Sequence, residues 1–230
     1  EILHNPINNK IYCANGLSDD ITVIDGERDS VIKTIRVGRW PYWLCHNSQN
    51  NKIYCANWDD TTVSVIDSDR DSVIATIRVG RSPYPLIYNP INNKIYCGNW
   101  DETTVSVIDG SRDSVIATID VGGIYLEDIC HNPIGNKIYV VVSGADHVAV
   151  IDSRNDRIIA LVPVGFIPRA LIYNPINNKI YCARWVRDGD IPVIDGVTNQ
   201  IITTIITGRP PFTFCHNPRE NRIYVANYYY

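Results

Sequence analysis

The sequence predicts an all-β fold, a β-propeller built from four-stranded antiparallel blades. Three observations predict it. Each repeat holds four short runs rich in β-branched residues, bounded by the turn formers Asn, Asp, Gly and Pro. No long stretch spaces its apolar residues at the 3.6-residue period of a helix. A motif of the type Asn-Pro-x-x-Asn-Lys-Ile-Tyr returns every 42 or 43 residues, opening at Asn5, Asn47, Asn89, Asn132, Asn174 and Asn217.

The second repeat shows the expected order of elements. Polar turns are expected at residues 47–51, 57–60 and 67–71, and Gly80 closes the repeat. The four runs between these turns predict a meander of antiparallel strands. These strands are expected at residues 41–46, 52–56, 61–66 and 72–79.

A four-stranded sheet with apolar residues on both faces needs a neighbour on each face. About 42 residues and four strands per unit are typical of propeller blades that pack face to face around an axis. We therefore expect a single propeller domain over residues 1–230, with five full blades and two strands of a sixth. The expected blades span about 1–38, 41–80, 83–122, 125–165 and 168–208, with a partial blade at 211–230.

An open sheet edge favours aggregation, so an unfinished sixth blade needs completion. We expect the chain to belong to a larger ring of six to eight blades. The alternative is that a partner chain, such as another copy, closes the ring. The chain starts at Glu1 and contains no Met, so we also expect its original start to be missing.

Composition and motifs exclude several classes of function. The chain carries 21 basic and 25 acidic residues without a basic run, which argues against nucleic-acid binding. No apolar stretch approaches the length of about 18 residues that a membrane helix needs. No nucleophile elbow, phosphate-binding loop, paired-glycine loop or zinc-protease motif is present. We therefore assign no catalytic residue, no cofactor and no metal, and lean against an enzyme.

The seven cysteines occupy two positions of the repeat. Val, Leu and Ile fill the same positions in other copies, which predicts buried apolar sites in preference to disulfides or metal ligands. Only the second copy carries Cys at both positions. Cys45 and Cys55 are therefore the one pair that could be neighbours on adjacent strands. The two groups are Cys13, Cys55, Cys97 and Cys182, and Cys45, Cys130 and Cys215.

Strand order places the loops at two ends of each sheet. Turns after the first and third strands share one end, which we call the turn end. Loops after the second strand and the crossovers between blades share the other, the loop end. At the turn end, the Asp residues that end the third strands are expected to accept local backbone N–H bonds, as are the Asn-Pro and Asn-Lys pairs. These Asp residues are Asp25, Asp67, Asp109, Asp152 and Asp195.

The loop end varies between copies and is rich in Trp, Tyr and Arg, the residues that anchor interfaces and stack on sugars or cations. Loops on a rigid scaffold are also where binding sites concentrate. The alternative is that Trp58 and Trp100, at equivalent positions, simply cover blade edges. The binding candidates are Arg39, Trp40, Tyr42, Trp58, Arg81, Tyr84, Trp100, Tyr125, Arg169, Trp185, Arg187, Arg209 and Phe212.

Histidines and carboxylates give weaker signals. Four histidines share one repeat position, where capping of the first turn is expected in preference to metal binding. His147 stands alone in a predicted loop beside Asp146. Loop-end carboxylates are candidates for holding a cation at the pore. The histidines are His4, His46, His131 and His216; the carboxylates are Asp59, Asp60, Asp101, Glu102, Asp146 and Asp188.

The pattern "NPxxNKIYCAN…TTVSVID…SVIATIRVG…P" resembles the YVTN family of β-propeller repeats, including surface-layer-type propellers. The family's Tyr-Val-Thr-Asn strand corresponds to residues 54–57 and 224–227, whereas the fourth copy, residues 139–142, lacks the Asn. The resemblance implies an extracytoplasmic setting: secreted, cell-surface or periplasmic. It implies no single activity.

Three functional hypotheses follow. The first is a non-catalytic binding module of a secreted or cell-surface protein that presents its aromatic, Arg-rich loops to a protein or glycan. The second is an enzyme or redox-complex subunit, similar to propeller lactonases or amine-dehydrogenase large subunits, with a small-molecule or cation site at the pore. The third is a structural spacer in a multidomain surface protein. A fold alone does not choose among them.

Overall fold

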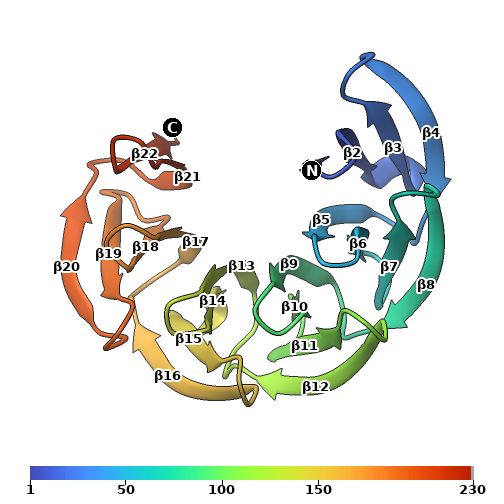
Figure 1. Ribbon diagram of the computed structural model, residues 1–230. Coiled ribbons are helices and arrows are strands. Elements are labelled where there is room, and N and C mark those ends of the chain that lie inside the picture. The colour runs from blue at the N-terminus through green and yellow to red at the C-terminus, as the bar shows by residue number, and fades with distance from the viewer. Residues whose placement is uncertain (229–230) are drawn as a thin grey trace. The chain divides into compact units, whose positions relative to one another are not determined.

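The computed structural model describes residues 1–228. Within them the chain forms six antiparallel sheets in sequence order, five of four strands and one of two (Figure 1). The sheets fall into two compact units, Glu1–Thr118 and the residues from Ile119 onward. This arrangement confirms the predicted fold class.

The first unit holds three meanders, in which consecutive strands pair. The first sheet contains β1 (Ile2–Asn5), β2 (Lys10–Asn15), β3 (Asp20–Asp25) and β4 (Ser30–Arg36). The second contains β5 (Pro41–Asn47), β6 (Lys52–Asn57), β7 (Thr62–Asp67) and β8 (Ser72–Arg78). The third contains β9 (Pro83–Asn89), β10 (Lys94–Asn99), β11 (Thr104–Asp109) and β12 (Ser114–Asp120), the last of which runs into the second unit.

The second unit holds two meanders and the two-stranded sheet. The fourth sheet contains β13 (Leu126–Asn132), β14 (Lys137–Val142), β15 (His147–Asp152) and β16 (Arg157–Pro163). The fifth contains β17 (Pro168–Asn174), β18 (Lys179–Arg184), β19 (Asp190–Asp195) and β20 (Ile201–Ile206). The sixth contains β21 (Pro211–Asn217) and β22 (Arg222–Asn227).

The strands predicted for the second repeat lie within one residue of those observed at each end. Short 3-10 turns, η1 (Gly16–Ser18) and η2 (Ser143–Ala145), form the loops after β2 and β14. Among residues 1–228, no helix has the length and apolar character needed to cross a bilayer.

The hydrophobic core lies between consecutive sheets. Tyr54 of β6, for example, packs in one cluster with Ile77 of β8 and with Ile108 of β11 in the next sheet. The same pattern joins the first sheet to the second and the fourth to the fifth. Complete burial of an aliphatic side chain contributes about 1.5–3 kcal/mol, so each sheet depends on its neighbour for stability.

The cysteines follow the packing prediction, with two exceptions. All seven are free thiols, and the five in the second to fifth sheets are buried. Burial raises the pKa of Cys45 to about 12. The exceptions are Cys13, in the first sheet, which is only partly buried, and Cys215, in the two-stranded sheet, which is exposed.

The proposed cross-strand pairing of Cys45 with Cys55 is wrong. The register of β5 and β6 places Cys55 opposite Leu44 and Cys45 opposite Tyr54. Because side chains alternate between the faces of a sheet, this one-residue offset directs the two thiols to opposite faces.

At the turn end the predicted local hydrogen bonds are present. Asp67 Oδ1 accepts bonds from the backbone N–H groups of Asp69 and Arg70, both at 3.0 Å. Equivalent bonds reach Asp25, Asp109, Asp152 and Asp195. In all six repeats the opening Asn also accepts a bond from the backbone N–H two residues later.

The same turns account for two further repeated residues: the second Asn of the motif and the histidine that precedes its first Asn. Asn51 has a left-handed backbone with φ of 54°, a conformation that Asn tolerates. The ring of His46 lies 3.3 Å from Asn51 Oδ1. His4 and His131 make the same contact with Asn9 and Asn136, as the capping prediction requires. The prediction fails for His216, whose Nε2 is buried without a hydrogen-bond partner.

The repeat motif also joins consecutive sheets through side chains. Lys52 Nζ lies 2.6 Å from Asp113 Oδ2, and Tyr54 OH donates a 2.6 Å bond to Asp113 Oδ1. Asn47 Nδ2 donates to Asn93 Oδ1 of the next sheet at 2.8 Å. We call this set of contacts between one sheet and the turn end of the next the inter-sheet latch.

The latch recurs elsewhere in each unit. Lys10 and Tyr12 bind Asp71, and Lys137 and Tyr139 bind Asn199. Burial and the nearby carboxylate raise the pKa of the Tyr54 phenol, which keeps it a hydrogen-bond donor. The repeated Lys-Ile-Tyr run is thus more than a strand: it fastens one sheet to the next.

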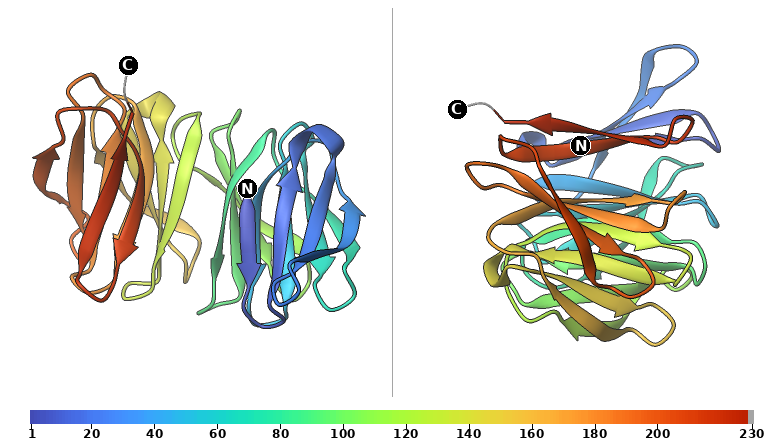
Figure 2. Two further views of the ribbon diagram at one scale, coloured as in Figure 1. Left: turned by 90° about the horizontal axis from the view of Figure 1, so that it is seen from above. Right: turned by 90° about the vertical axis from the view of Figure 1, so that its left-hand side faces the viewer.

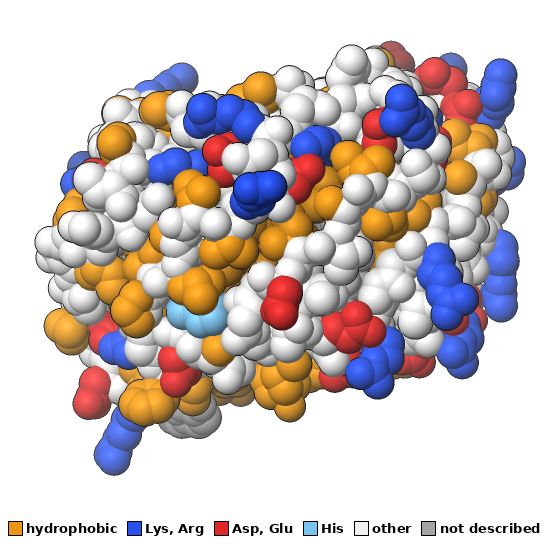
Figure 3. Space-filling view, turned by 90° about the horizontal axis from the view of Figure 1, so that it is seen from below, with side chains coloured by type: hydrophobic (Ala, Val, Ile, Leu, Met, Phe, Trp, Pro, Cys, Tyr) orange, Lys and Arg blue, Asp and Glu red, His pale blue; other side chains and the backbone are white. Residues whose placement is uncertain are grey.

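The fourth strand of each full sheet keeps apolar residues at its surface. Equivalent isoleucines there are 44–48% exposed. Figure 3 shows hydrophobic side chains at the surface interspersed with Lys, Arg, Asp and Glu. These isoleucines are Ile32, Ile74, Ile116, Ile159 and Ile202.

Candidate functional site at the loop end

The loop end of each sheet is bound to the crossover that leads into it. Trp58 N–H donates to the carbonyl of Trp40 at 2.9 Å, and Trp185 N–H donates to that of Ile167 at 2.9 Å. The same bond joins Trp100 to Ser82, Ser143 to Tyr125 and Tyr228 to Pro210. The crossovers and the loops after the second strands therefore meet, as the strand order predicts. In Figure 2 the loops gather at the two ends of the strands in each unit.

The crossovers carry left-handed residues that are not glycine. Trp40, Ser82, Tyr125 and Ile167 have φ values of 54°, 50°, 62° and 52°. This conformation is uncommon for bulky residues and is an outlier for a β-branched one such as Ile167. Strain of this kind concentrates at functional sites, so it marks the crossovers as places where side-chain direction matters.

In the first unit the loop end gathers five aromatic rings. The Trp58 ring centroid lies 5.1 Å from that of Trp100, 5.7 Å from that of Tyr84 and 5.8 Å from that of Tyr42. Tyr42 and Tyr84 lie 5.3 Å apart. Four predicted candidates from two sheets therefore come together as one aromatic cluster.

The fifth ring, Trp43, was not predicted. Its centroid lies 5.1 Å from that of Tyr84, and its Nε1 donates to the carbonyl of Leu86 at 3.0 Å. An alignment of the first strands of the repeats identifies the position, because Asp128 replaces Trp43 in the fourth copy. Asp128 Oδ2 accepts a bond from the Leu171 N–H at 2.7 Å, so both side chains reach the first strand of the next sheet.

Trp40 lies apart from this cluster. An added Cβ on Gly16 would meet the Trp40 indole at 3.3 Å, so the ring packs over the backbone of the η1 loop. The Trp40 side chain is still 39% exposed. Of the predicted tryptophans, it therefore fits structural cover best.

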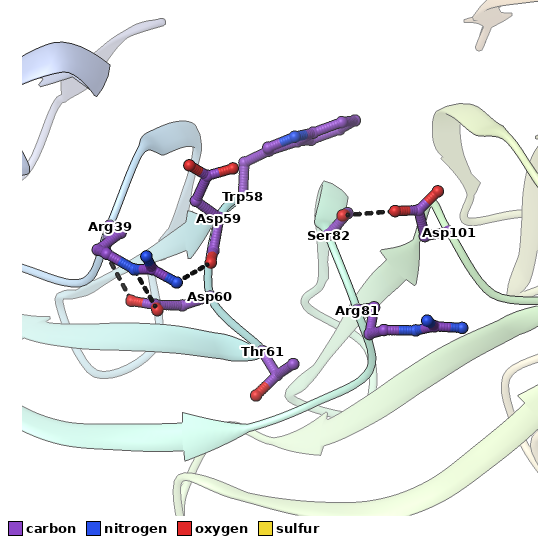
Figure 4. Close-up of a pocket in the computed structure, with 8 residues that line it drawn as sticks. All are labelled: Arg39, Trp58, Asp59, Asp60, Thr61, Arg81, Ser82 and Asp101. Atoms are coloured by element: carbon purple, nitrogen blue, oxygen red, sulfur yellow. Dashed lines mark hydrogen bonds and ion pairs between the residues drawn. The ribbon is translucent and has the colours of Figure 1, made fainter.

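A hollow of about 350 Å³ opens beside Trp58 (Figure 4). Its lining is both aromatic and polar, and Arg39 and Arg81 contribute one guanidinium each. The residues that line it are Arg39, Trp58, Asp59, Asp60, Thr61, Arg81, Ser82 and Asp101.

Ion pairs hold both guanidiniums in place. Arg39 Nε lies 3.1 Å from Asp60 Oδ1, and Arg81 Nε lies 3.4 Å from Glu102 Oε1. The bond to Asp60 raises the pKa of Arg39. Arg39 also donates from Nη2 to the Asp59 carbonyl at 2.8 Å (Figure 4). Asp59 and Asp101 are exposed at its rim, so the site offers hydrogen-bond donors and acceptors next to an indole face.

The loop end of the second unit is built around an arginine. The Arg169 guanidinium carbon lies 4.5 Å from the Trp185 ring centroid and 5.4 Å from that of Phe212. Tyr228 packs on the other side of the cluster, 5.9 Å from Trp185. Three predicted candidates therefore meet here through cation–π and ring contacts.

Three other candidates lie at exposed loop positions. Arg187 and Arg209 are exposed. Tyr125 is 39% exposed in a strained crossover. An ion pair between Arg184 and Asp190, absent from the predicted site, braces the loop that carries Trp185.

The loop-end carboxylates bind the chain itself. Asp60 and Glu102 hold arginines, and Asp146 Oδ1 accepts a bond from the Ile167 N–H. In the part of the chain that the structure describes, no group of three or more His, Cys, Asp or Glu residues could hold a metal ion.

The prediction for His147 was wrong about its setting. It opens β15, is buried, and its Nε2 lies 2.8 Å from the carbonyl oxygen of Val121. The imidazole of His147 therefore links the crossover before β13 to the fourth sheet.

The chain is a β-propeller protein, and comparison with solved structures supports this class. A chain of Kuenenia stuttgartiensis hydrazine synthase superposes with a TM-score of 0.80 and 17% identity, covering 97% of this chain and 72% of that one. A chain of a mitotic checkpoint complex superposes with a TM-score of 0.85 and 11% identity, covering 98% and 70%. At these identities the likeness concerns the fold alone. No family model and no curated protein sequence matches the chain.

Proposed function

We propose that this propeller is a non-catalytic binding module that holds a protein or glycan partner at the loop end. The aromatic cluster beside the polar hollow in the first unit carries the proposal. A partly buried indole next to Arg and Asp side chains suits a partner with both apolar faces and hydroxyl, amide or charged groups. The cation–π cluster around Arg169 is a second, separate candidate contact in the second unit.

Membership of the YVTN repeat family belongs to the same proposal. It is supported by the four segments that recur in order in each repeat. The extracytoplasmic location, at a cell surface or in a surface layer, follows from that resemblance. The ring of six to eight blades, completed by a further segment or chain, also remains a proposal. It is supported by the two-stranded sixth sheet.

The alternative of an enzyme or redox-complex subunit has one possible support, the likeness to hydrazine synthase. At 17% identity that likeness shows the fold alone. No geometry among residues 1–228 favours this function over binding. The spacer hypothesis predicts that no partner depends on the loop-end aromatics.

A binding screen against an array of immobilised glycans and against surface-protein extracts tests the proposal. Any ligand found is then retested with Trp58→Ala and Trp100→Ala. We expect each variant to weaken binding at least tenfold, because buried aromatic anchors contribute about 2 kcal/mol or more. Ile7→Ala, at an exposed position in the turn after β1 at the turn end, is the control and should bind normally. Unchanged binding by folded Trp variants would reject the proposal.

A further inference from the structure

The fifth sheet presents half of an inter-sheet latch without its acceptor. Lys179 and Tyr181 occupy the positions that Lys52 and Tyr54 hold in the second sheet. In three other sheets these side chains bind an Asp or Asn in the turn between the third and fourth strands of the next sheet. The sixth sheet has only β21 and β22 among the described residues, so that turn is not available to Lys179 and Tyr181.

The other half of the latch is complete. Asn174 Nδ2 donates to Asn221 Oδ1 at 2.7 Å, the bond that Asn47 makes to Asn93. The two-stranded sheet is therefore seated against the fifth sheet in the same register as a full sheet. Among the described residues, no third and fourth strands of the sixth sheet cover the adjoining surface of the fifth.

Burial changes sharply at that surface. Ile205 is 44% exposed, whereas Ile77, Ile35, Ile119 and Val162 at the same repeat position are 4–6% exposed. Tyr181 is only partly buried, whereas its counterparts Tyr12, Tyr54, Tyr96 and Tyr139 are fully buried. All six residues of β20 are exposed.

An apolar hollow of about 270 Å³ lies between the fifth and sixth sheets. Its lining includes Tyr181, Ile191, Ile205, Phe214, Ile223 and Val225. Where two complete sheets pack together, the third strand of the second sheet places an isoleucine in the cluster that corresponds to this hollow. That isoleucine is fully buried. These are Ile66, Ile108 and Ile194.

We propose that this surface binds a β-hairpin of the repeat's own third-and-fourth-strand type. The first strand of the hairpin would pair with the free edge of β22 and insert an Ile into the hollow. Its turn would carry an Asp in the left-handed conformation, as Asp71 does with φ of 50°. That carboxylate would accept bonds from Lys179 and Tyr181. The partner is thus defined by three features: alternating β-branched residues, a strand ending in Ile-Asp, and an acidic turn.

Two properties of this surface favour such a hairpin: the charge of Lys179 and the unpaired backbone groups at the edge of β22. Lys179 is a cation beside an apolar hollow, so an acidic turn is complementary to it. The unpaired backbone groups of β22 are satisfied only by an added strand or by water. This inference rests on the proposed completion of the ring, and it is independent of binding at the loop end.

The test uses the full chain and a synthetic peptide with the sequence of residues 62–78. We expect saturable binding of one peptide per chain by titration calorimetry. Hydrogen exchange at the amides of β22 should slow when the peptide is bound, since they gain strand partners. Neither change is expected with a scrambled peptide.

Matched variants distinguish the predicted latch contacts from non-specific binding of the peptide. The peptide change Asp71→Ala should weaken binding about tenfold or more, and Ile66→Ser should abolish it. Arg70→Ala, at an exposed turn position, should bind within about twofold of the parent peptide. In the chain, Lys179→Met should weaken binding as Asp71→Ala does, whereas Lys33→Met on exposed β4 should not.

Three outcomes would overturn the inference. These are no saturable binding, equal binding of the Asp71→Ala and Arg70→Ala peptides, and a dimer of the chain that Lys179→Met dissociates but the peptide does not displace. The last result would place a second copy on this surface. Trp58→Ala should leave peptide binding unchanged, so failure at this surface is distinct from failure at the loop end.

Discussion

The two ends of the sheets are built in different ways. At the turn end, the same residues return in nearly every repeat, and most of them make the same bonds. Asp67 and its counterparts close their own turns, while Lys52 and Tyr54 reach the next sheet. At the loop end the backbone bonds are equally regular, but the side chains differ from sheet to sheet.

The difference teaches how a repeat protein separates stability from recognition. Turn-end side chains are held by partners within the protein, so a substitution there disturbs the packing of two sheets. Loop-end side chains such as Trp58 and Arg169 sit on backbone that is already hydrogen-bonded, so their identity is free to vary. Within residues 1–228, the bulky residues with positive φ, Trp40, Tyr125 and Ile167, all lie at the loop end.

The largest expected effect concerns the latch. Asp113→Ala removes the 2.6 Å acceptor of both Lys52 and Tyr54 and leaves these partly buried groups only their longer bonds to the Gly110 carbonyl, at 3.5 and 3.3 Å. We expect the free energy of unfolding to fall by about 2–4 kcal/mol more than in Asp29→Ala. Asp29 holds the same turn position and left-handed backbone in the first sheet but is exposed. The strain that Ala suffers at positive φ therefore cancels between the two variants. Equal losses in urea-induced unfolding would mean that the latch does not stabilise the turn end.

A smaller effect is expected at a strained crossover. Ile167→Gly should stabilise the protein by up to about 1 kcal/mol, because Gly relieves the left-handed strain of a residue that is half exposed. Ile124→Gly, in the preceding crossover but without positive φ, should destabilise it by a similar amount. Thermal unfolding of both variants makes the comparison. A loss of stability in Ile167→Gly equal to that in Ile124→Gly would show that the crossover is not strained.

The smallest effect is a pH dependence at the turn end. Burial lowers the pKa values of His46 and His131. Their contribution is present above the unfolded-state pKa of about 6.5 and is lost as the pH falls through the lower folded-state values. We expect stability to fall between pH 7 and pH 5, by less than about 1 kcal/mol for each half-exposed ring.

His46→Tyr supplies the control for this effect, because Tyr88 fills the same position in the third repeat. The variant should lose part of the acid sensitivity while unfolding normally at pH 7. If the slope of unfolding free energy against pH is the same in both proteins, His46 is not a source of that sensitivity.

Much of the fold could be predicted because its signals are local. Alternation of β-branched residues sets the strands, and Asn, Asp and Gly at fixed offsets set the turns. The candidate site was found in part for the same reason, since Trp58, Trp100 and Tyr84 stand out as aromatics in otherwise polar loops. Trp43 and Asp128 were missed because they lie within strands, where an aromatic or a carboxylate has many roles.

The sequence by itself determined the repeat length, the strands, the turn-end hydrogen bonds within each sheet and the face on which aromatics collect. Each of these depends on residues close together in the chain. Only the tertiary structure decided which side chains cross between sheets, since Lys52 and Asp113 are 61 positions apart. The register of β5 and β6, which separates Cys45 from Cys55, and the clustering of Trp58 with Trp100 were decided in the same way. Such contacts depend on the packing of whole sheets, which no local pattern encodes.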